Sequence, residues 1–149
     1  MSGTLIATLT LEVDFEDILQ IGPGPDGDRA VAFISGGRLE GEHIAATVLG
    51  GEDWFTRRPD GSLGIDVRLT LHSDDEVFMT LAYQGELTGT AEALAAFGRG
   101  EAMRAGSHQI RTTAVIGCGD ERYAWLDGVE LTGEGEQTQA GPAYRLYVA

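Results

Sequence analysis

The sequence contains no lysine. Its ten basic residues are all arginine, and they face 24 acidic residues, so the formal net charge is −14 over 149 residues. A nucleic-acid partner requires a basic stripe that pairs with phosphates. The arginines here are scattered among acids, so we expect no nucleic-acid partner. The same charge argues against docking on an anionic membrane surface.

Cysteine and long apolar runs are also scarce. Cys118 is the only cysteine, which excludes an internal disulfide and fits a cytoplasmic location. No apolar run approaches the ~18 residues of a membrane helix, and the first residues lack the basic and apolar regions of a signal peptide. We therefore expect no membrane partner.

The usual marks of metal and cofactor sites are missing as well. His43, His72 and His108 lie in three separate segments without the spacing of metal ligands. The chain has no Gly-x-Ser-x-Gly motif, no phosphate loop and no dinucleotide fingerprint. We therefore expect neither a bound metal nor a cofactor.

What the sequence does contain is typical of one globular domain spanning residues 1–149. Apolar residues make up 42% of the chain, and 22 glycines divide it into short segments. The clearest segment is 63–71, where every second residue is apolar from Leu63 to Leu71, while Asp66 and Arg68 lie on the other face. This alternation predicts a half-buried strand.

Similar patterns predict an all-β fold. One short helix is expected, capped by Thr90 and ended by Gly98, and the pair Gly36-Gly37 predicts a bulge. Short turns between successive strands favour antiparallel pairing, and open edges are a liability, so we expect a closed antiparallel β-barrel of about eight strands. Such a barrel can hold one small ligand. The expected strands are 4–13, 31–39, 44–49, 63–71, 77–84, 109–116, 124–132 and 144–148.

An ordered set of motifs carries a resemblance to a known family. The chain resembles the domain of unknown function 3237, a family of small bacterial and fungal proteins. The matching segments are Ile34-Ser-Gly-Gly-Arg-Leu-Glu-Gly41, Gly50-Gly-Glu-Asp-Trp54, Arg58-Pro-Asp-Gly61, Ile65-Asp-Val-Arg-Leu-Thr70, Ser73-Asp-Asp75, Arg111-Thr-Thr113 and Tyr123-Ala-Trp-Leu-Asp127.

The resemblance implies a calycin-like β-barrel. Some fungal members of the family look like isomerases or cyclases that act on aromatic polyketides. Three positions depart from the family pattern: Asp127 stands where asparagine is usual, Glu76 where glycine is usual, and Ile110 where an aromatic residue is usual. An amide both donates and accepts hydrogen bonds whereas a carboxylate only accepts, so a role carried over to Asp127 is altered.

Asp53 and Trp54 follow two glycines and form the first candidate for a site. In one interpretation Trp54 lines the barrel mouth and binds substrate, while Asp53 is a general base whose pKa is raised by desolvation. In the other, Trp54 plugs the end of the barrel and Asp53 caps a turn.

Asp66 and Arg68 share the polar face of the strand at 63–71. If this face is internal, Arg68 stabilises negative charge on a substrate oxygen and Asp66 contacts the substrate. If it is external, the two form a surface ion pair worth ~0–1 kcal/mol. Periodicity separates the two faces without deciding which one lines the lumen.

Four further residues complete the candidate site. Tyr83 is either a general acid in an apolar lumen or a packing residue with its hydroxyl at the rim. Arg111 either holds an anionic or carbonyl oxygen or forms a salt bridge at the barrel end. Trp125 and Asp127 share one face, and if it is internal they supply an aromatic wall and a polar contact.

Together with what the resemblance implies, these residues suggest as a first hypothesis a cofactor-free isomerase, cyclase or lyase that acts on a small apolar carbonyl or phenolic compound in the barrel. In this hypothesis Asp53 moves a proton, and Arg68 and Arg111 hold the developing negative charge. The alternatives are a non-catalytic small-molecule-binding barrel and an interaction module whose lumen is filled by side chains. A homo-oligomer is expected in each case, since 45–49 and 79–82 are apolar on both faces.

Overall fold

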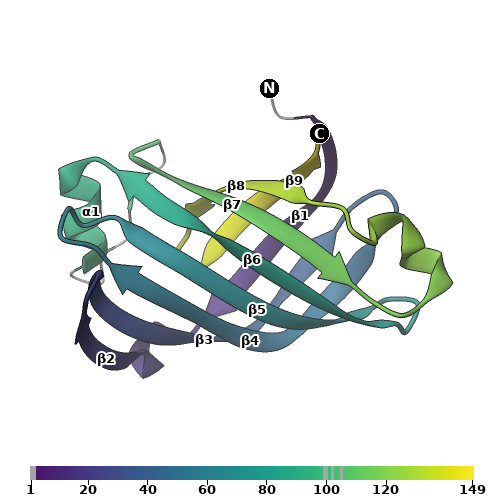
Figure 1. Cartoon of the computed structure of the whole chain (residues 1–149), viewed down its shortest axis with the longest axis horizontal. Coiled ribbons are helices and arrows are strands. Elements are labelled where there is room, and N and C mark those ends of the chain that lie inside the picture. Colours follow the sequence, from purple (N-terminus) through teal and green to yellow (C-terminus); the bar gives the residue numbers. More distant parts are fainter. Residues whose placement is uncertain (1–2, 99–100, 102, 105) are drawn as a thin grey trace.

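The computed structural model describes residues 3–98, 101, 103–104 and 106–149. Within these residues eight antiparallel strands close into a barrel, and a ninth, β2, pairs with β3 outside the closed ring (Figure 1). The elements in chain order are β1 (Thr4–Val13), the 3₁₀-helix η1 (Phe15–Asp17), β2 (Leu19–Gly24), β3 (Gly27–Glu40), β4 (Ala45–Arg57), β5 (Leu63–Ser73), β6 (Phe78–Gly89), α1 (Ala91–Gly98), β7 (His108–Gly117), the 3₁₀-helix η2 (Glu121–Leu126), β8 (Leu131–Gln137) and β9 (Pro142–Val148).

The long strand β3 closes the barrel. Its first part pairs with β2 and its second part with β1, while its other edge pairs with β4. The register with β1 shifts so that Ser35 is left over as an extra residue, which confirms the irregularity predicted at Gly36-Gly37. A side chain at Gly37 would lie 2.1 Å from the carbonyl oxygen of Thr10, so only glycine permits this close pairing.

The apolar faces of the strands point into the barrel. Leu63, Val67 and Leu71 are buried, whereas Asp66 and Arg68 between them are exposed. Burial of alternate side chains on every strand supplies the main stabilising term, at about 25 cal/mol per Å² of apolar surface. The leucines with no exposed surface left are Leu9, Leu39, Leu71, Leu81 and Leu131.

The two ends of the barrel differ. The end that carries η2, which we call the packed end, is covered by this helix, whose Tyr123 and Leu126 join the core. The opposite end, which we call the open end, is surrounded by η1, β2, α1 and the turn between β8 and β9 (Figure 1). Most of the fully buried leucines lie in the half of the barrel toward the packed end, so the open end is where space for a ligand remains.

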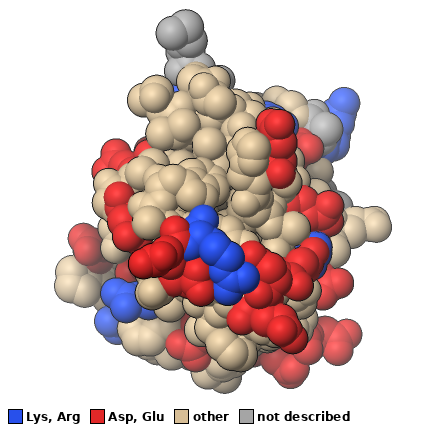
Figure 2. Space-filling view, turned by 90° about the vertical axis from the view of Figure 1, so that its right-hand side faces the viewer, with Lys and Arg blue, Asp and Glu red and all other residues tan. Residues whose placement is uncertain are grey.

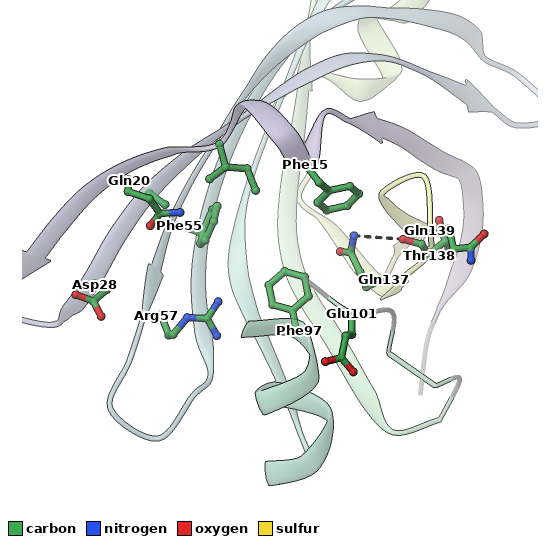
Figure 3. Close-up of a pocket in the computed structure, with 12 residues that line it drawn as sticks. Phe15, Gln20, Asp28, Phe55, Arg57, Phe97, Glu101, Gln137, Thr138 and Gln139 are labelled. Atoms are coloured by element: carbon green, nitrogen blue, oxygen red, sulfur yellow. Dashed lines mark hydrogen bonds between the residues drawn. The ribbon is translucent and has the colours of Figure 1, made fainter. Parts of the chain in front are cut away.

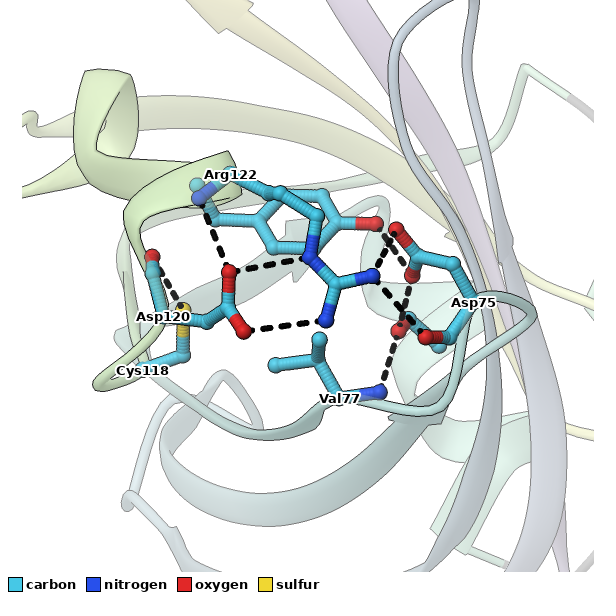
Figure 4. A network of polar contacts seen from close by, with 7 residues as sticks. Asp75, Val77, Cys118, Asp120 and Arg122 are labelled. Atoms are coloured by element: carbon cyan, nitrogen blue, oxygen red, sulfur yellow. Dashed lines mark hydrogen bonds and ion pairs between the residues drawn. The ribbon is translucent and has the colours of Figure 1, made fainter.

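A polar network fastens η2 to the packed end. The Asp75 carboxylate accepts hydrogen bonds from Ser73 Oγ, from Tyr123 Oη at 2.7 Å and from Arg122 at 3.2 Å, and Arg122 also pairs with Asp120 at 2.9 Å (Figure 4). Figure 2 looks at this end and shows a basic group flanked on both sides by acidic side chains. The groups of Ser73, Tyr123 and Arg122 that contact the Asp75 carboxylate hold its pKa below its ordinary value, chiefly through the hydrogen bond from Ser73.

The Thr90 cap of the expected helix was confirmed, whereas the strand expected at 124–132 was wrong. The helix α1 begins after Thr90, whose Oγ1 accepts a hydrogen bond from the backbone of Ala93 at 3.1 Å. Glu76 has a φ of 69°, in the left-handed region that favours glycine. The strand expected at 124–132 starts at Leu131, since residues 121–126 form η2. The glycine- and proline-containing segment 19–24 forms the short strand β2.

The described residues contain no helix that is long and apolar enough to span a membrane.

Candidate active site

A pocket of about 490 Å³ opens at the open end of the barrel. It continues inward into a smaller chamber of about 40 Å³, with which it shares Phe15, Phe55, Phe97 and Gln137. Ligand pockets commonly have volumes of roughly 300–1,000 Å³ and mostly apolar walls with a few polar groups. Figure 3 shows Phe15, Phe55 and Phe97 around one space, with polar side chains at its edges.

The strand β4 supplies the central side chains of the pocket. Because side chains alternate along a strand, Asp53, Phe55 and Arg57 all point inward. Asp53 lines the inner chamber, Phe55 lines both parts, and Arg57 lines the outer pocket. The intervening Trp54 faces outward and is 62% exposed, and its Nε1 donates to Glu52 Oε1 on the outer surface at 3.1 Å. Asp53 and Trp54 therefore do not share one side of the barrel wall.

Asp53 lies in an environment that disfavours its charged form. Its Oδ1 atom is buried and has no hydrogen-bond partner within the described part of the chain. This burial, together with the negative charge of Asp66 on the neighbouring strand, raises the pKa of Asp53 from 3.8 to about 7. A carboxyl group with a pKa near neutral pH can both accept and release a proton under physiological conditions.

Two tyrosines lie close to this carboxyl group. Asp53 is the cross-strand neighbour of Val67 on β5, and Val67 is the cross-strand neighbour of Tyr83 on β6. Asp53 and Tyr83 therefore lie at the same height on the inner face of the barrel, with β5 between their strands. Tyr144 lines the same inner chamber, and its ring lies 5.0 Å from that of Tyr83 at 64°. The Tyr83 hydroxyl has no hydrogen-bond partner among the residues that the structure describes. Burial keeps the pKa of both tyrosines well above 10, so both remain proton donors at neutral pH.

The structure brings together two of the eight residues that the sequence put forward. Asp53 and Tyr83 face the same interior. The other six are exposed on the outer surface, away from the pocket, because they alternate with the buried apolar side chains or lie at the packed end. These six are Trp54, Asp66, Arg68, Arg111, Trp125 and Asp127.

This placement corrects the interior roles expected for those six residues. Arg68 is between the buried Val67 and Leu69, and Arg111 is between the buried Ile110 and Thr112, so neither guanidinium faces the lumen. Trp125 is 43% exposed at the packed end and forms no wall of the pocket. Asp66 also lies outside the pocket, but its negative charge still contributes to the raised pKa of Asp53.

Several pocket residues were missed by the sequence reasoning. Phe55 and Arg57 follow Asp53 at intervals of two, and this spacing alone places them on the same face as Asp53. Tyr144, Phe15 and Phe97 come from distant segments, and only the closed topology brings them to one end of the barrel. Among the described residues, no group of three or more histidine, cysteine, aspartate or glutamate side chains is placed to hold a metal ion.

Comparison with known proteins agrees with this architecture. The family described as "Protein of unknown function (DUF3237)" matches residues 3–149. The chain belongs to the DUF3237 family. A curated relative, the UPF0311 protein RPA1785 of Rhodopseudomonas palustris, is 27% identical over 118 residues, which cover 78% of this chain and 77% of the relative.

Solved structures share the DUF3237 barrel. The crystal structure of RPA1785, a conserved protein of unknown function, matches with a TM-score of 0.89 and 24% identity over 96% of this chain and 93% of that one. A protein of unknown function from Clostridium acetobutylicum matches with a TM-score of 0.84 and 23% identity over 97% and 95%. An enzyme from Penicillium herquei matches with a TM-score of 0.62 and 15% identity over 95% and 91%. At these identities the likeness shows the fold.

Proposed function

We propose that the protein is a cofactor-free isomerase, cyclase or lyase that moves a proton on a small apolar carbonyl or phenolic compound bound at the open end of the barrel. The observation that carries this proposal is the Asp53 carboxyl group, buried at the inner end of an aromatic pocket with one oxygen unpartnered. A carboxyl group left without a partner in such a place is available to a ligand. The Penicillium herquei structure adds that a barrel of this shape occurs in an enzyme.

In the proposed mechanism, Asp53 as carboxylate removes a proton from the carbon next to a carbonyl group. The negative charge moves to the carbonyl oxygen, which accepts a hydrogen bond from the hydroxyl of Tyr83 or Tyr144. Asp53, now protonated, returns the proton to a different carbon, to oxygen or to a leaving group. Isomerisation, cyclisation and elimination share the first of these steps.

The test is exchange of α-protons with solvent deuterium. 2-Tetralone, an apolar ketone whose ring is fused to benzene and whose α-protons are acidic, is incubated with the protein in D₂O, and deuterium incorporation is followed by mass spectrometry. We expect the wild-type protein to accelerate exchange and Asp53→Asn to lose roughly 10²–10⁴-fold of that rate. The matched control is Asp26→Asn, which removes the same group from the exposed turn between β2 and β3.

The pH dependence sharpens the test. The carboxylate form of Asp53 is the base, and its pKa is about 7, so the exchange rate should rise with pH and level off above about pH 7. An Asp53→Asn protein that exchanges as fast as wild type would end the proton-transfer role. Binding of aryl ketones without any exchange would favour the alternative, a non-catalytic small-molecule-binding barrel.

A cytoplasmic location and a homo-oligomeric state remain predictions. Large apolar side chains exposed on the outer face, such as Leu49 at 50% and Phe78 at 70%, support an interface between copies. Analytical ultracentrifugation tests the second prediction, since a monomer at micromolar concentration would contradict it.

A further inference from the structure

Arg57 lines the pocket, and its side chain forms no ion pair with any carboxylate in the part of the chain that the structure describes. Its side chain lines the outer pocket, and its guanidinium carbon lies 5.8 Å from the centre of the Phe97 ring. The Arg57 backbone pairs with neighbouring strands, but no side-chain hydrogen bond of its guanidinium is found within the described residues. A guanidinium group has five N–H donors in a fixed fork, which matches the paired oxygens of a carboxylate or a phosphate.

The surrounding charges limit what Arg57 can accept. Asp28 is the cross-strand neighbour of Arg57, and Glu101 also lines the pocket. Figure 3 shows both carboxylates at the edge of the space that Arg57 enters. Asp28 offsets part of the positive charge of Arg57, so a ligand with two or more negative charges, such as a phosphate ester, would be repelled, whereas a single negative charge can pair with the guanidinium.

The spacing along β4 sets the size of the ligand. Arg57 and Asp53 are four residues apart on one face, so their Cα atoms are about 13 Å apart. Phe55 lies between them on the same face, opposite Phe15 and Phe97 (Figure 3). A ligand held at Arg57 by its charged group therefore places one or two rings among the phenylalanines and its far end toward Asp53.

We propose that the pocket binds a small aromatic monocarboxylate, with the carboxylate on Arg57 and the ring among Phe15, Phe55 and Phe97. The reaction of this ligand rests on the proposed function, since Asp53 would act on the end of the molecule that is farthest from Arg57. Binding at Arg57 does not depend on that reaction. Arg57 binds the ligand and takes no part in proton transfer.

Calorimetric titration with three probes of one shape tests this proposal: 2-naphthoate, its methyl ester and 2-naphthylmethylamine. We expect wild-type protein to bind 2-naphthoate more tightly than the ester or the amine. In Arg57→Gln the affinity for 2-naphthoate should fall roughly 10- to 100-fold, while the affinity for the ester stays the same. The matched control is Arg145→Gln, which removes the same charge from the exposed outer face of β9 and should leave all three affinities unchanged.

Failure of this proposal differs from failure of the proposed function. 2-Naphthoate is a binding probe that requires no proton transfer, so Asp53→Asn should still bind it. Equal binding of 2-naphthoate to wild type and Arg57→Gln would overturn the inference, as would preference for the ester or the amine, or no binding by wild type at millimolar concentration. If 2-naphthoate binds through Arg57 and Asp53→Asn nevertheless exchanges 2-tetralone normally, the ligand class stands and the catalytic role falls.

Discussion

Replacing Asp53 with asparagine should stabilise the protein at neutral pH and above. Asp53 is buried, its Oδ1 has no hydrogen-bond partner in the described ranges, and its pKa rises from 3.8 to about 7 on folding. The folded protein therefore binds this proton more tightly than the unfolded chain does. Asparagine has nearly the same shape as a protonated aspartate and cannot ionise, so the variant avoids the unfavourable burial of charge.

The size of the effect follows from linkage. At about 1.36 kcal/mol per pKa unit, a rise from 3.8 to about 7 corresponds to about 4 kcal/mol. Because the pKa of Asp53 is higher in the folded protein than in the unfolded chain, the wild-type protein is most stable with respect to this group below about pH 4. Its unfolding free energy falls by about 4 kcal/mol as pH rises to about 7. The difference in unfolding free energy between Asp53→Asn and wild type should grow by about 1.4 kcal/mol per pH unit in this range and stay constant above it.

Urea unfolding at a series of pH values between about 4 and 8 measures this difference directly. Groups that titrate alike in both proteins cancel in the comparison, so acid unfolding of the rest of the molecule does not obscure it. Asp26→Asn, in an exposed turn, controls for the change in net charge. A difference between Asp53→Asn and wild type that stays constant across the series would refute the argument that the fold raises the pKa of Asp53.

Three further predictions concern other parts of the barrel. Tyr83→Phe should leave the unfolding free energy unchanged or raise it by up to about 1 kcal/mol, since the buried hydroxyl has no hydrogen-bond partner among the residues described. A loss above about 2 kcal/mol in urea unfolding would show that the hydroxyl is hydrogen-bonded, for example to Tyr144. Glu76→Gly should raise the unfolding free energy by about 1 kcal/mol because it relieves a left-handed backbone at φ 69°, and a decrease would contradict this. Asp75→Asn should lower the melting temperature at pH 7. The difference from wild type should shrink as pH falls below about 4, because the pKa of Asp75 is lower in the folded protein than in the unfolded chain. A difference that does not depend on pH would contradict the claim that Ser73, Tyr123 and Arg122 stabilise the charged form of Asp75.

The fold was largely predictable because the alternation of apolar residues is strong. In the segment 63–71 five apolar residues share one face, and this face is the buried one in the structure. The prediction at 124–132 failed for a local reason. Asp120 caps a 3₁₀-helix through its hydrogen bond to the backbone of Arg122, and Tyr123 and Leu126, three residues apart, both face the core. Alternation does not detect a helix of this length.

The site was only partly predictable because strand periodicity does not say which face is internal. Arg68 was a site candidate only if the polar face of β5 lined the lumen, and the structure places the apolar face there. For β4 the sequence carried enough information, since a buried Asp53 implies that Phe55 and Arg57 share its side. The contribution of α1 and η1 to the pocket depends on how the closed barrel brings distant segments to one end.

The contrast between Asp53 and Asp75 supports assigning function to the open end. The packed end surrounds Asp75 with donors from Ser73, Arg122 and Tyr123, which lower its pKa, so this carboxylate remains charged and fastens η2. The open end gives Asp53 burial and a nearby like charge, which raise its pKa at a cost to stability of about 4 kcal/mol above neutral pH. An apolar side chain at position 53 would avoid that cost and fill the inner chamber. Groups that destabilise a fold in this way concentrate at functional sites, where the strained ionisation is what the chemistry uses.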